Sequence, residues 1–280
     1  MKLKISRSEN LPVLPTVLVQ ILRLYEDVNV SARTLETLIA QDPALTARIL
    51  KVAGSAQYGN QAVPSISRAV SLVGMQTLRS ISISLGYQYL LASNNNRSGL
   101  DQVALWKHSL ATGIAAREIG RVLGMANSEE LYVSGLIHDI GILTLNRFAE
   151  PELGMVLKTA KLRKISLTEA DVATYGFGHD EIGGFLADKW KLSAVTADAI
   201  RWHNDPDKSV KFREQTRVVA AANYLAYTIG YPAVPGVAPG SECETFLTQM
   251  NLTDEQIAEI STRVAFDLGH ATHALGGRAA

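Results

Sequence analysis

The spacing of apolar residues constrains the fold of this sequence more than any other feature. Apolar residues recur at intervals of three and four almost throughout the 280 residues, and no stretch alternates apolar and polar residues over the length of a strand. Such spacing is typical of amphipathic helices, and a hydrophobic content of 47% is enough for a substantial core. The sequence therefore predicts an all-α protein.

One polar segment interrupts this pattern. Residues 93–99, "SNNNRSG", are turn-forming and contain no apolar residue. We therefore predict two packed helical lobes, an amino-terminal lobe over residues 1–95 and a second lobe over residues 96–280. The Pro/Gly-rich stretch "YPAVPGVAPGS" is expected to be a surface loop of the second lobe. Its helices are predicted near 100–123, 128–139, 151–164, 168–175, 179–190, 193–203, 211–229 and 253–275.

Several helix ends carry local signals. Asp42 is predicted to be an N-cap, with Pro43 at the first helical position. Gly74 could end a helix in a left-handed conformation, and Thr253 to Gln256 has the spacing of a capping box. The apolar stretch "ISISLGYQYLL" fits either the core between the lobes or a dimer face. We favour the core, and a homodimer is left open.

Charge and cysteine content narrow the classes of partner and compartment. Lys plus Arg and Asp plus Glu number 27 each, so no net positive field draws the molecule to nucleic acid or to an anionic membrane. No apolar run reaches the roughly 18 residues that a membrane helix needs, and the amino end lacks a signal-peptide cleavage pattern. The single cysteine, Cys243, fits a reducing compartment. We expect a cytoplasmic protein that binds neither nucleic acid nor membrane.

Four histidines have small or apolar neighbours at helical spacing and should face inward. They are His108, His138, His179 and His203, and Asp139 follows the second of them directly. An inward imidazole must be hydrogen-bonded, paired or bound to metal. A shared site with nitrogen and oxygen ligands suits Zn, Fe, Mn or Ni, whereas a metal-free polar network would satisfy the same groups.

Three further sets of residues accompany these histidines in the sequence. Gly141 is consistent with a helix end at the His-Asp doublet, which would let both side chains reach one ion. The remaining histidines, His270 and His273, are expected on the surface near the carboxyl end. Asp180 could be an acid near a metal-bound water, but Asp180 and Glu181 could equally be ordinary first-turn acids, and we favour the second interpretation.

The order of these motifs resembles a known family. "WKHS", "LIHDIG" and the helix "VVAAANYLAY" resemble the HD superfamily of metal-dependent phosphohydrolases, with Asn223 where that pattern has its last aspartate. More closely, "LPVLPTVLVQILRL", "SISRAVSLVGMQTLRSISIS" and "GHDEIGGFLADKWKLS" resemble the HDOD family of bacterial signalling domains. The resemblance covers nearly all of the chain. It implies a helical lobe characteristic of HDOD proteins packed on an HD-like helical lobe.

The resemblance also implies a site and a function. The residues of that site would bind a metal ion with reduced affinity, because Asn223 lacks the charge of an aspartate. Asp139 would be the catalytic group if the site were active. Departures at Ala104, Ile142 and Asn204 point instead to a non-catalytic regulatory protein that acts through a protein partner in a signalling pathway. The alternative is a metal-dependent phosphohydrolase. Arg68 and Arg79 are hypothesised to contact an acidic partner. The implied metal residues are His108, His138, Asp139, His179, His203 and Asn223.

Overall fold

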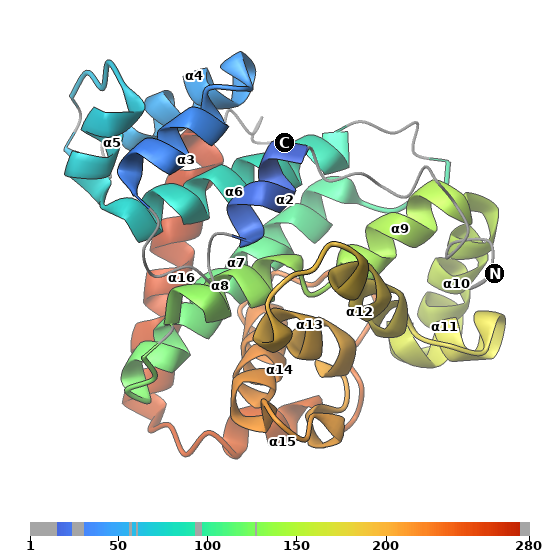
Figure 1. Cartoon of the computed structure of the whole chain (residues 1–280). Coiled ribbons are helices and arrows are strands. Elements are labelled where there is room, and N and C mark those ends of the chain that lie inside the picture. Colours follow the sequence, from blue (N-terminus) through green and yellow to red (C-terminus); the bar gives the residue numbers. More distant parts are fainter. Residues whose placement is uncertain are drawn as a thin grey trace.

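The computed structural model confirms the all-α prediction (Figure 1). It describes residues 16–23, 31–55, 58–59, 61–92, 97–126 and 128–274, and these contain helices and no strand. No helix in those ranges combines the length and the apolar character needed to cross a bilayer.

The amino-terminal helices are short, and polar residues cap several of them. The Oδ1 atom of Asp42 accepts a hydrogen bond of 2.9 Å from the backbone N–H of Leu45, which confirms the predicted N-cap. Gly74 has a positive φ of 82°, but its ψ of 159° is not that of a left-handed helix. The helices are α2 (Thr16–Arg23), α3 (Ala32–Ile39), α4 (Pro43–Ala53), α5 (Ile66–Val73) and α6 (Met75–Ala92).

Helix α6 is shared between the two halves of the chain. It packs against α2, α4 and α5 and also against the two helices that follow, and residues 81–87 are all buried. Residues 81–87 of the apolar stretch are therefore core, as favoured above. Arg79 is only 3% exposed, so its predicted contact with an acidic partner was wrong. Arg68 remains exposed. Residues 93–96 lie outside the described ranges, and the predicted division at residue 95 stays a prediction.

The second half holds two helices that the spacing did not predict, α9 and α15. Helix α9 begins directly after Asp139, whose side chain makes no capping hydrogen bond. The predicted capping box is confirmed, since Thr253 and Gln256 exchange hydrogen bonds of 2.9 and 3.2 Å. The helices are α7 (Gln102–Val122), α8 (Ser128–Ile137), α9 (Ile140–Phe148), α10 (Glu150–Arg163), α11 (Leu167–Tyr175), α12 (His179–Lys189), α13 (Ala194–Trp202), α14 (Arg213–Thr228), α15 (Cys243–Thr248) and α16 (Asp254–Ala274).

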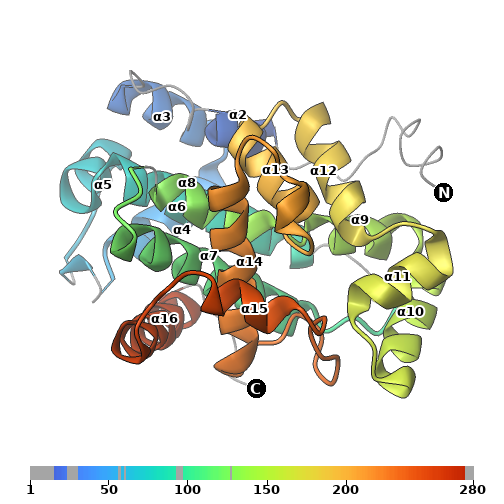
Figure 2. The same cartoon turned by 90° about the horizontal axis from the view of Figure 1, so that it is seen from below.

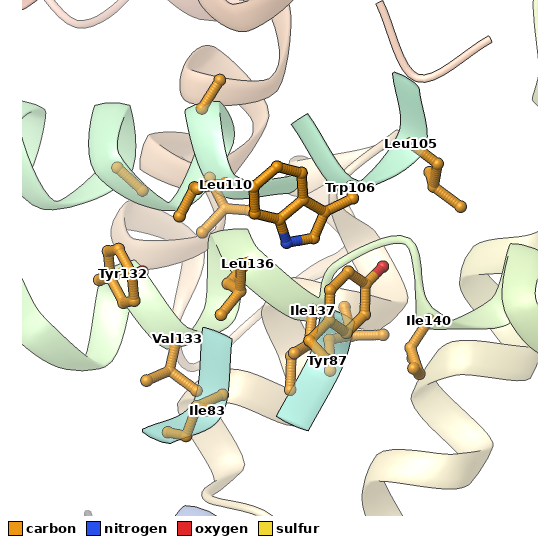
Figure 3. Close-up of a cluster of buried hydrophobic side chains, with 14 of the residues drawn as sticks. Ile83, Tyr87, Leu105, Trp106, Leu110, Tyr132, Val133, Leu136, Ile137 and Ile140 are labelled. Carbon is orange, nitrogen blue, oxygen red and sulfur yellow. The ribbon is translucent and has the colours of Figure 1, made fainter. Parts of the chain in front are cut away.

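The core lies where α6, α7 and α8 meet (Figure 3). Tyr87 and Trp106 are both buried there, and the Tyr87 hydroxyl accepts a hydrogen bond of 3.1 Å from Ser109. On the other side of α7, helices α14 and α16 pack along it (Figure 2). Helix α7 is thus surrounded by helices from both ends of the sequence, so side chains that it carries inward are shielded from solvent.

Candidate metal centre

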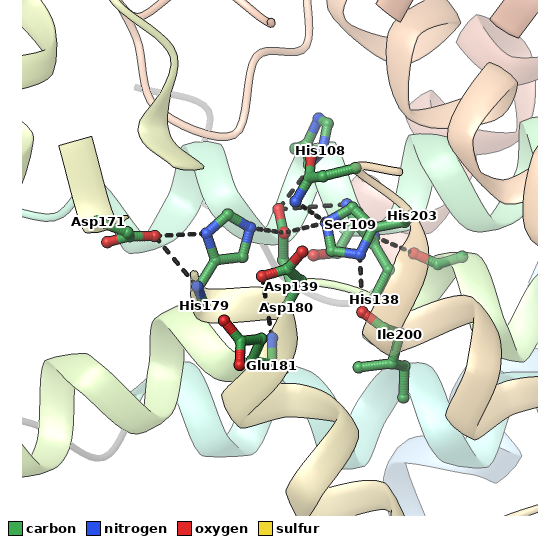
Figure 4. Close-up of polar contacts among 12 residues, drawn as sticks. His108, Ser109, His138, Asp139, Asp171, His179, Asp180, Glu181, Ile200 and His203 are labelled. Atoms are coloured by element: carbon green, nitrogen blue, oxygen red, sulfur yellow. Dashed lines mark hydrogen bonds and ion pairs between the residues drawn. The ribbon is translucent and has the colours of Figure 1, made fainter. Parts of the chain in front are cut away.

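The four predicted histidines converge on one carboxylate (Figure 4). Asp139 lies in the turn between α8 and α9, and every one of the four imidazoles directs its Nε2 atom to it. Each of these side chains is at most 4% exposed. The distances from Nε2 to the nearest carboxylate oxygen are 3.7 Å for His108, 3.2 Å for His138, 3.2 Å for His179 and 3.6 Å for His203.

The carboxylate of Asp139 divides the histidines into two groups. Oδ2 faces His108 and His138, and we call these three residues the first trio. Oδ1 faces His179 and His203, which form the second trio with Asp139. Within each trio one ligand atom per residue lies within 4.8 Å of the others, so each trio could hold a metal ion. A carboxylate that offers one oxygen to each side could also bridge two ions.

The Nδ1 atom of each imidazole is held by an acceptor outside the trios. His138 and His203 use the backbone carbonyl three residues earlier, at 2.7 and 2.9 Å. Histidines that bind metal nearly always donate their other N–H in this way, which fixes both the tautomer and the ring orientation. The other two acceptors come from elsewhere in the chain: the carbonyl of Tyr231 at 2.7 Å for His108 and the carboxylate of Asp171 at 2.6 Å for His179.

Two glycines allow the close approach of α7 and α8 that forms the first trio. A Cβ atom on Gly113 would lie 2.9 Å from the backbone oxygen of Tyr132. A Cβ atom on Gly135 would lie 2.8 Å from the backbone oxygen of Thr112. Real Cβ atoms do not approach backbone oxygens so closely, so a side chain at either position would push the helices apart. His108 and the His-Asp doublet meet because the glycines at these two positions let the helices cross closely.

A second glycine crossing joins α9 to α12 and forms the second trio. A Cβ atom on Gly141 would overlap the carbonyl oxygen of His179, and one on Gly183 would lie 3.3 Å from the side chain of Ile140. The predicted helix end at the His-Asp doublet is confirmed, but Gly141 does not form it. Helix α8 ends at Ile137, and Gly141 lies inside α9, where it lets α12 approach. That contact brings Asp139 beside His179.

The two trios differ in how their Nε2 atoms are satisfied. Those of His108 and His138 are buried and have no hydrogen-bond partner. In the second trio, the amide nitrogen of Asn204 lies 3.0 Å from Nε2 of His203. His179 is clamped between the carboxylates of Asp139 and Asp171. The first trio therefore has two buried nitrogen atoms that face Oδ2 of Asp139 without a hydrogen bond. In the second trio, Asn204 donates to His203 and Asp171 holds His179 through Nδ1.

Burial and neighbouring charge shift the pKa values of these groups in opposite directions. Burial and, to a smaller extent, the nearby His138 lower the pKa of His108 to about 4, against the opposing effects of Asp139 and Asn223. Burial also lowers the pKa of His203 to about 4. These two imidazoles are neutral at pH 7, the form that binds metal.

The carboxylate of Asp139 and the remaining imidazole behave differently. Burial raises the pKa of Asp139, but His138 and His179 outweigh burial and hold it well below its usual range. Burial lowers the pKa of His179, but Asp139 and Asp171 outweigh burial and raise it well above the ordinary value. Asp139 is thus ionised, as a metal ligand must be.

A cavity of about 350 Å³ opens onto both trios. Five residues of the predicted set line it, including Asn223, and the sixth, His138, lies beside Asp139 without lining the cavity. The loop between α14 and α15 closes the other side. None of the described residues that line the cavity is Lys or Arg. The lining residues are His108, Asp139, Ser166, Leu167, Thr168, Glu169, His179, His203, Asn204, Asn223, Tyr227, Ala233, Val234, Val237, Ala238, Pro239, Gly240, Ser241, Glu242 and Cys243.

Other predicted residues lie away from this space. Asp180 and Glu181 occupy the first turn of α12, and Asp180 accepts a hydrogen bond of 2.9 Å from the N–H of Glu181. Neither lines the cavity, in agreement with the first-turn interpretation. The side chains of His270 and His273 fall outside the described part of the molecule.

Two residues that orient histidines were missed by sequence reasoning. Asp171 is fully buried. In the sequence it lies two residues after Glu169, near the start of a predicted helix, where acidic residues are usually exposed. Tyr231 acts through its backbone oxygen, for which no side-chain signal exists. Its place in the loop was assigned no role by the sequence, although that loop orients His108.

The residues present fit a divalent transition metal. The donor set consists of imidazole nitrogens and a carboxylate, which suits Zn, Fe, Mn or Ni. Two of the donors, the Nε2 atoms of His108 and His138, are buried without another partner. Buried polar atoms are rarely left unsatisfied, so a bound cation is the simplest way to satisfy both. The cluster could thus bind a metal, with Asp139 and His138 among its ligands.

A family model matches most of this chain. The model of the HDOD domain matches residues 11–206. An "Uncharacterized protein" of Treponema pallidum (strain Nichols) is 31% identical over 223 residues, which is 78% of this chain and 42% of that relative. The chain thus spans less than half the length of that relative.

Solved structures share the fold. An HDOD domain protein of unknown function from Geobacter sulfurreducens matches with a TM-score of 0.81 and 23% identity, covering 98% of this chain and 96% of the other. A "Putative phosphohydrolase" from Shewanella amazonensis SB2B matches with a TM-score of 0.74 and 23% identity, over 98% and 96% of the two chains. With the family model matched over most of its length, this chain belongs to the HDOD family.

Proposed function

We propose that this chain is a regulatory HDOD protein that binds one divalent transition metal ion in the first trio and acts on a protein partner without efficient phosphohydrolysis. The observation that carries the proposal is the contrast inside the site. Two buried imidazole nitrogens have no hydrogen-bond partner, while the adjoining cavity has no Lys or Arg among its described lining residues. The site suits a cation, but its walls do not suit a phosphate.

The residues of the first trio would hold the ion. His108 and His138 would offer Nε2, and Asp139 would offer Oδ2. A bound cation would supply charge and Lewis acidity to the cavity. The backbone carbonyls behind both imidazoles keep the nitrogens directed inward, which lowers the cost of organising the site on binding.

The second trio would serve to hold Asp139 in place. His179 lies between two carboxylates, and His203 is paired with Asn204. Asn223, on the floor of the cavity, contributes no negative charge to a second ion. With a single carboxylate among the residues of both trios, two divalent ions would remain poorly neutralised.

A metal-dependent phosphohydrolase is the second candidate, and one observation favours it. Asp139 presents one oxygen to each trio, which is the arrangement of a carboxylate that bridges two ions in a hydrolytic centre. The Shewanella amazonensis protein of the same fold is named as a "Putative phosphohydrolase". In this reading Asp139 would also be the only carboxylate of the trios near the reacting water.

Metal analysis joined to a hydrolysis assay separates the two candidates. Protein is purified without chelator and without a nickel column, and metal per chain is measured together with turnover of a model phosphodiester and of nucleotides. We expect about one equivalent of metal and no turnover above the metal-free protein. Two equivalents with turnover that Asp139→Asn abolishes would establish the phosphohydrolase instead.

A gain-of-charge variant tests the role of the missing carboxylate. Asn223→Asp adds a negative charge to the cavity floor and should raise metal affinity by about 10-fold or more. Asn251→Asp is the matched control, because Asn251 is exposed and does not line the cavity. Equal affinities of the two variants would contradict a metal site beside Asn223.

A further inference from the structure

The outer wall of the cavity is largely apolar. Leu167 lines one side, and the loop between α14 and α15 supplies the other with Val234 and Val237, which are both buried. Ala233, Ala238 and Pro239 complete this surface. A ligand in the cavity would therefore pass from apolar walls at the loop to the polar floor at the trios, which is the usual character of a small-molecule site.

Apart from the histidines, the charged side chains that line the cavity are carboxylates. Glu169 and Glu242 both line it and both have exposed side chains. Oε2 of Glu169 is fixed in place by hydrogen bonds of 2.8 and 2.7 Å from the N–H and hydroxyl of Ser166. Lys161 lies beside Gly236 of the loop but is not part of the lining. A phosphate group in this part of the cavity would meet carboxylates without a compensating cation.

An aromatic ring also lines the cavity. Tyr227 on α14 is half-buried and belongs to the same lining as the two glutamates. The face of a tyrosine ring attracts cations, and carboxylates at the same mouth add to this attraction. At the other end of the cavity lie His108 and Asp139 of the first trio, where the Nε2 atoms of His108 and His138 are buried without a hydrogen bond. A metal ion held there under the proposed function would attract an anionic group.

We infer that the cavity binds a small ligand with one anionic, metal-binding head and a positively charged tail, and that it discriminates against ligands with a phosphate in the tail. The inference rests on the proposed function, because the head binds through the metal ion. The tail would lie between Tyr227, Glu169 and Glu242. Such a ligand would be sensed rather than hydrolysed, since nothing in the described lining is suited to hold a transferred phosphoryl group.

Three hydroxamates of equal chain length test this ligand class on the metal-loaded protein. Their tails end in an ammonium, a methyl or a phosphonate group, and their dissociation constants are measured by calorimetry at low salt. We expect the ammonium compound to bind most tightly, about tenfold more tightly than the phosphonate compound, with the methyl compound between them. Glu242→Lys should abolish this preference. Equal affinities for the three compounds, or tightest binding of the phosphonate, would overturn the inference.

The control variant is Glu244→Lys. Glu244 is an exposed acid two residues further along the chain that does not line the cavity, so its reversal should leave the order of the three compounds unchanged. A shift equal to that of Glu242→Lys would mean that general surface charge sets the preference and would reject the cavity as its source. Metal content is measured on every sample. Protein that binds no metal would fail the proposed function and the inference together, whereas metal-loaded protein without selectivity would fail the inference alone.

Discussion

The two trios are built alike but differ in how their polar atoms are hydrogen-bonded. Each arises at a glycine crossing of two helices, α7 with α8 for the first and α9 with α12 for the second, and both use the carboxylate of Asp139. In the second trio, Asn204 and Asp171 satisfy the polar groups internally. In the first trio two buried nitrogens stay without a partner. The difference indicates that internal hydrogen bonds can hold one such trio in place, while the other presents nitrogen atoms that could bind a ligand.

The largest expected effect concerns the crossing behind the second trio. Gly141→Ala places a Cβ atom on the carbonyl oxygen of His179, and because this contact is with backbone, α9 and α12 must separate. We expect a loss of about 3 kcal/mol or more in the free energy of unfolding. Urea denaturation measures it.

Two further glycine variants calibrate this result. Gly135→Ala, in the crossing behind the first trio, meets the backbone oxygen of Thr112 at 2.8 Å and should cost about 1 to 3 kcal/mol. Gly269→Ala on α16 has no atom within 4 Å of the added group and should stabilise by about 0.5 to 1 kcal/mol. A tolerated Gly141→Ala would mean that the crossing is looser than described.

The next largest effect is expected on metal affinity, and it distinguishes the two trios. His138 and His203 are matched, since each is buried and each holds its Nδ1 on the carbonyl three residues earlier. His138→Ala removes an unpartnered nitrogen and should weaken metal binding by at least about 100-fold. His203→Ala removes a nitrogen that Asn204 already satisfies and should weaken it by less than about 10-fold. Losses of equal size, measured by competition with a chromophoric chelator, would show that both trios bind the metal.

A smaller effect is expected at Asp171. Asp171→Asn keeps the shape of the side chain but removes the charge that faces Nδ1 of His179. We expect a cost of about 1 to 3 kcal/mol in the free energy of unfolding, because the change weakens a buried charged hydrogen bond. Metal affinity should change less than in His138→Ala. A loss of metal binding without a loss of stability would place His179 among the ligands.

The smallest effect is expected at Asn204. Asn204→Ala frees Nε2 of His203 and makes the second trio resemble the first. We expect a few-fold gain in affinity for a second equivalent of metal, of the size of one hydrogen bond. Metal titration followed by calorimetry measures it. An unchanged or weakened second site would indicate that the amide does not compete with metal.

Sequence reasoning reached the helices and the polar residues of the site for identifiable reasons. Apolar spacing and short-range caps such as Asp42 are local, so they can be found without coordinates. The inward position of His108, His138, His179 and His203 follows from the same spacing, because small neighbours mark a buried face. The place of Asn223 followed from the family resemblance.

The remaining features depend on contacts between distant segments. Helix α9 was missed because it begins at Asp139 with no capping side chain and follows α8 almost directly. The buried state of Arg79 and of Asp171 is decided by the helices packed over them, which the spacing within one helix does not reveal. The close approach at Gly141 required knowledge of which helix faces it. The division of the histidines between the two oxygens of Asp139 likewise required coordinates.

The loop between α14 and α15 has two structural roles, one of which depends on the carbonyl of Tyr231. The loop walls the cavity, and it also fixes the tautomer of His108 by accepting its Nδ1–H. A compound that displaced this segment would loosen an imidazole on the floor below, and an ion that tightened the imidazole would hold the segment in place. Thermodynamic reciprocity makes these two influences equal in size, so occupancy of the interior can be transmitted to the surface through a single backbone oxygen.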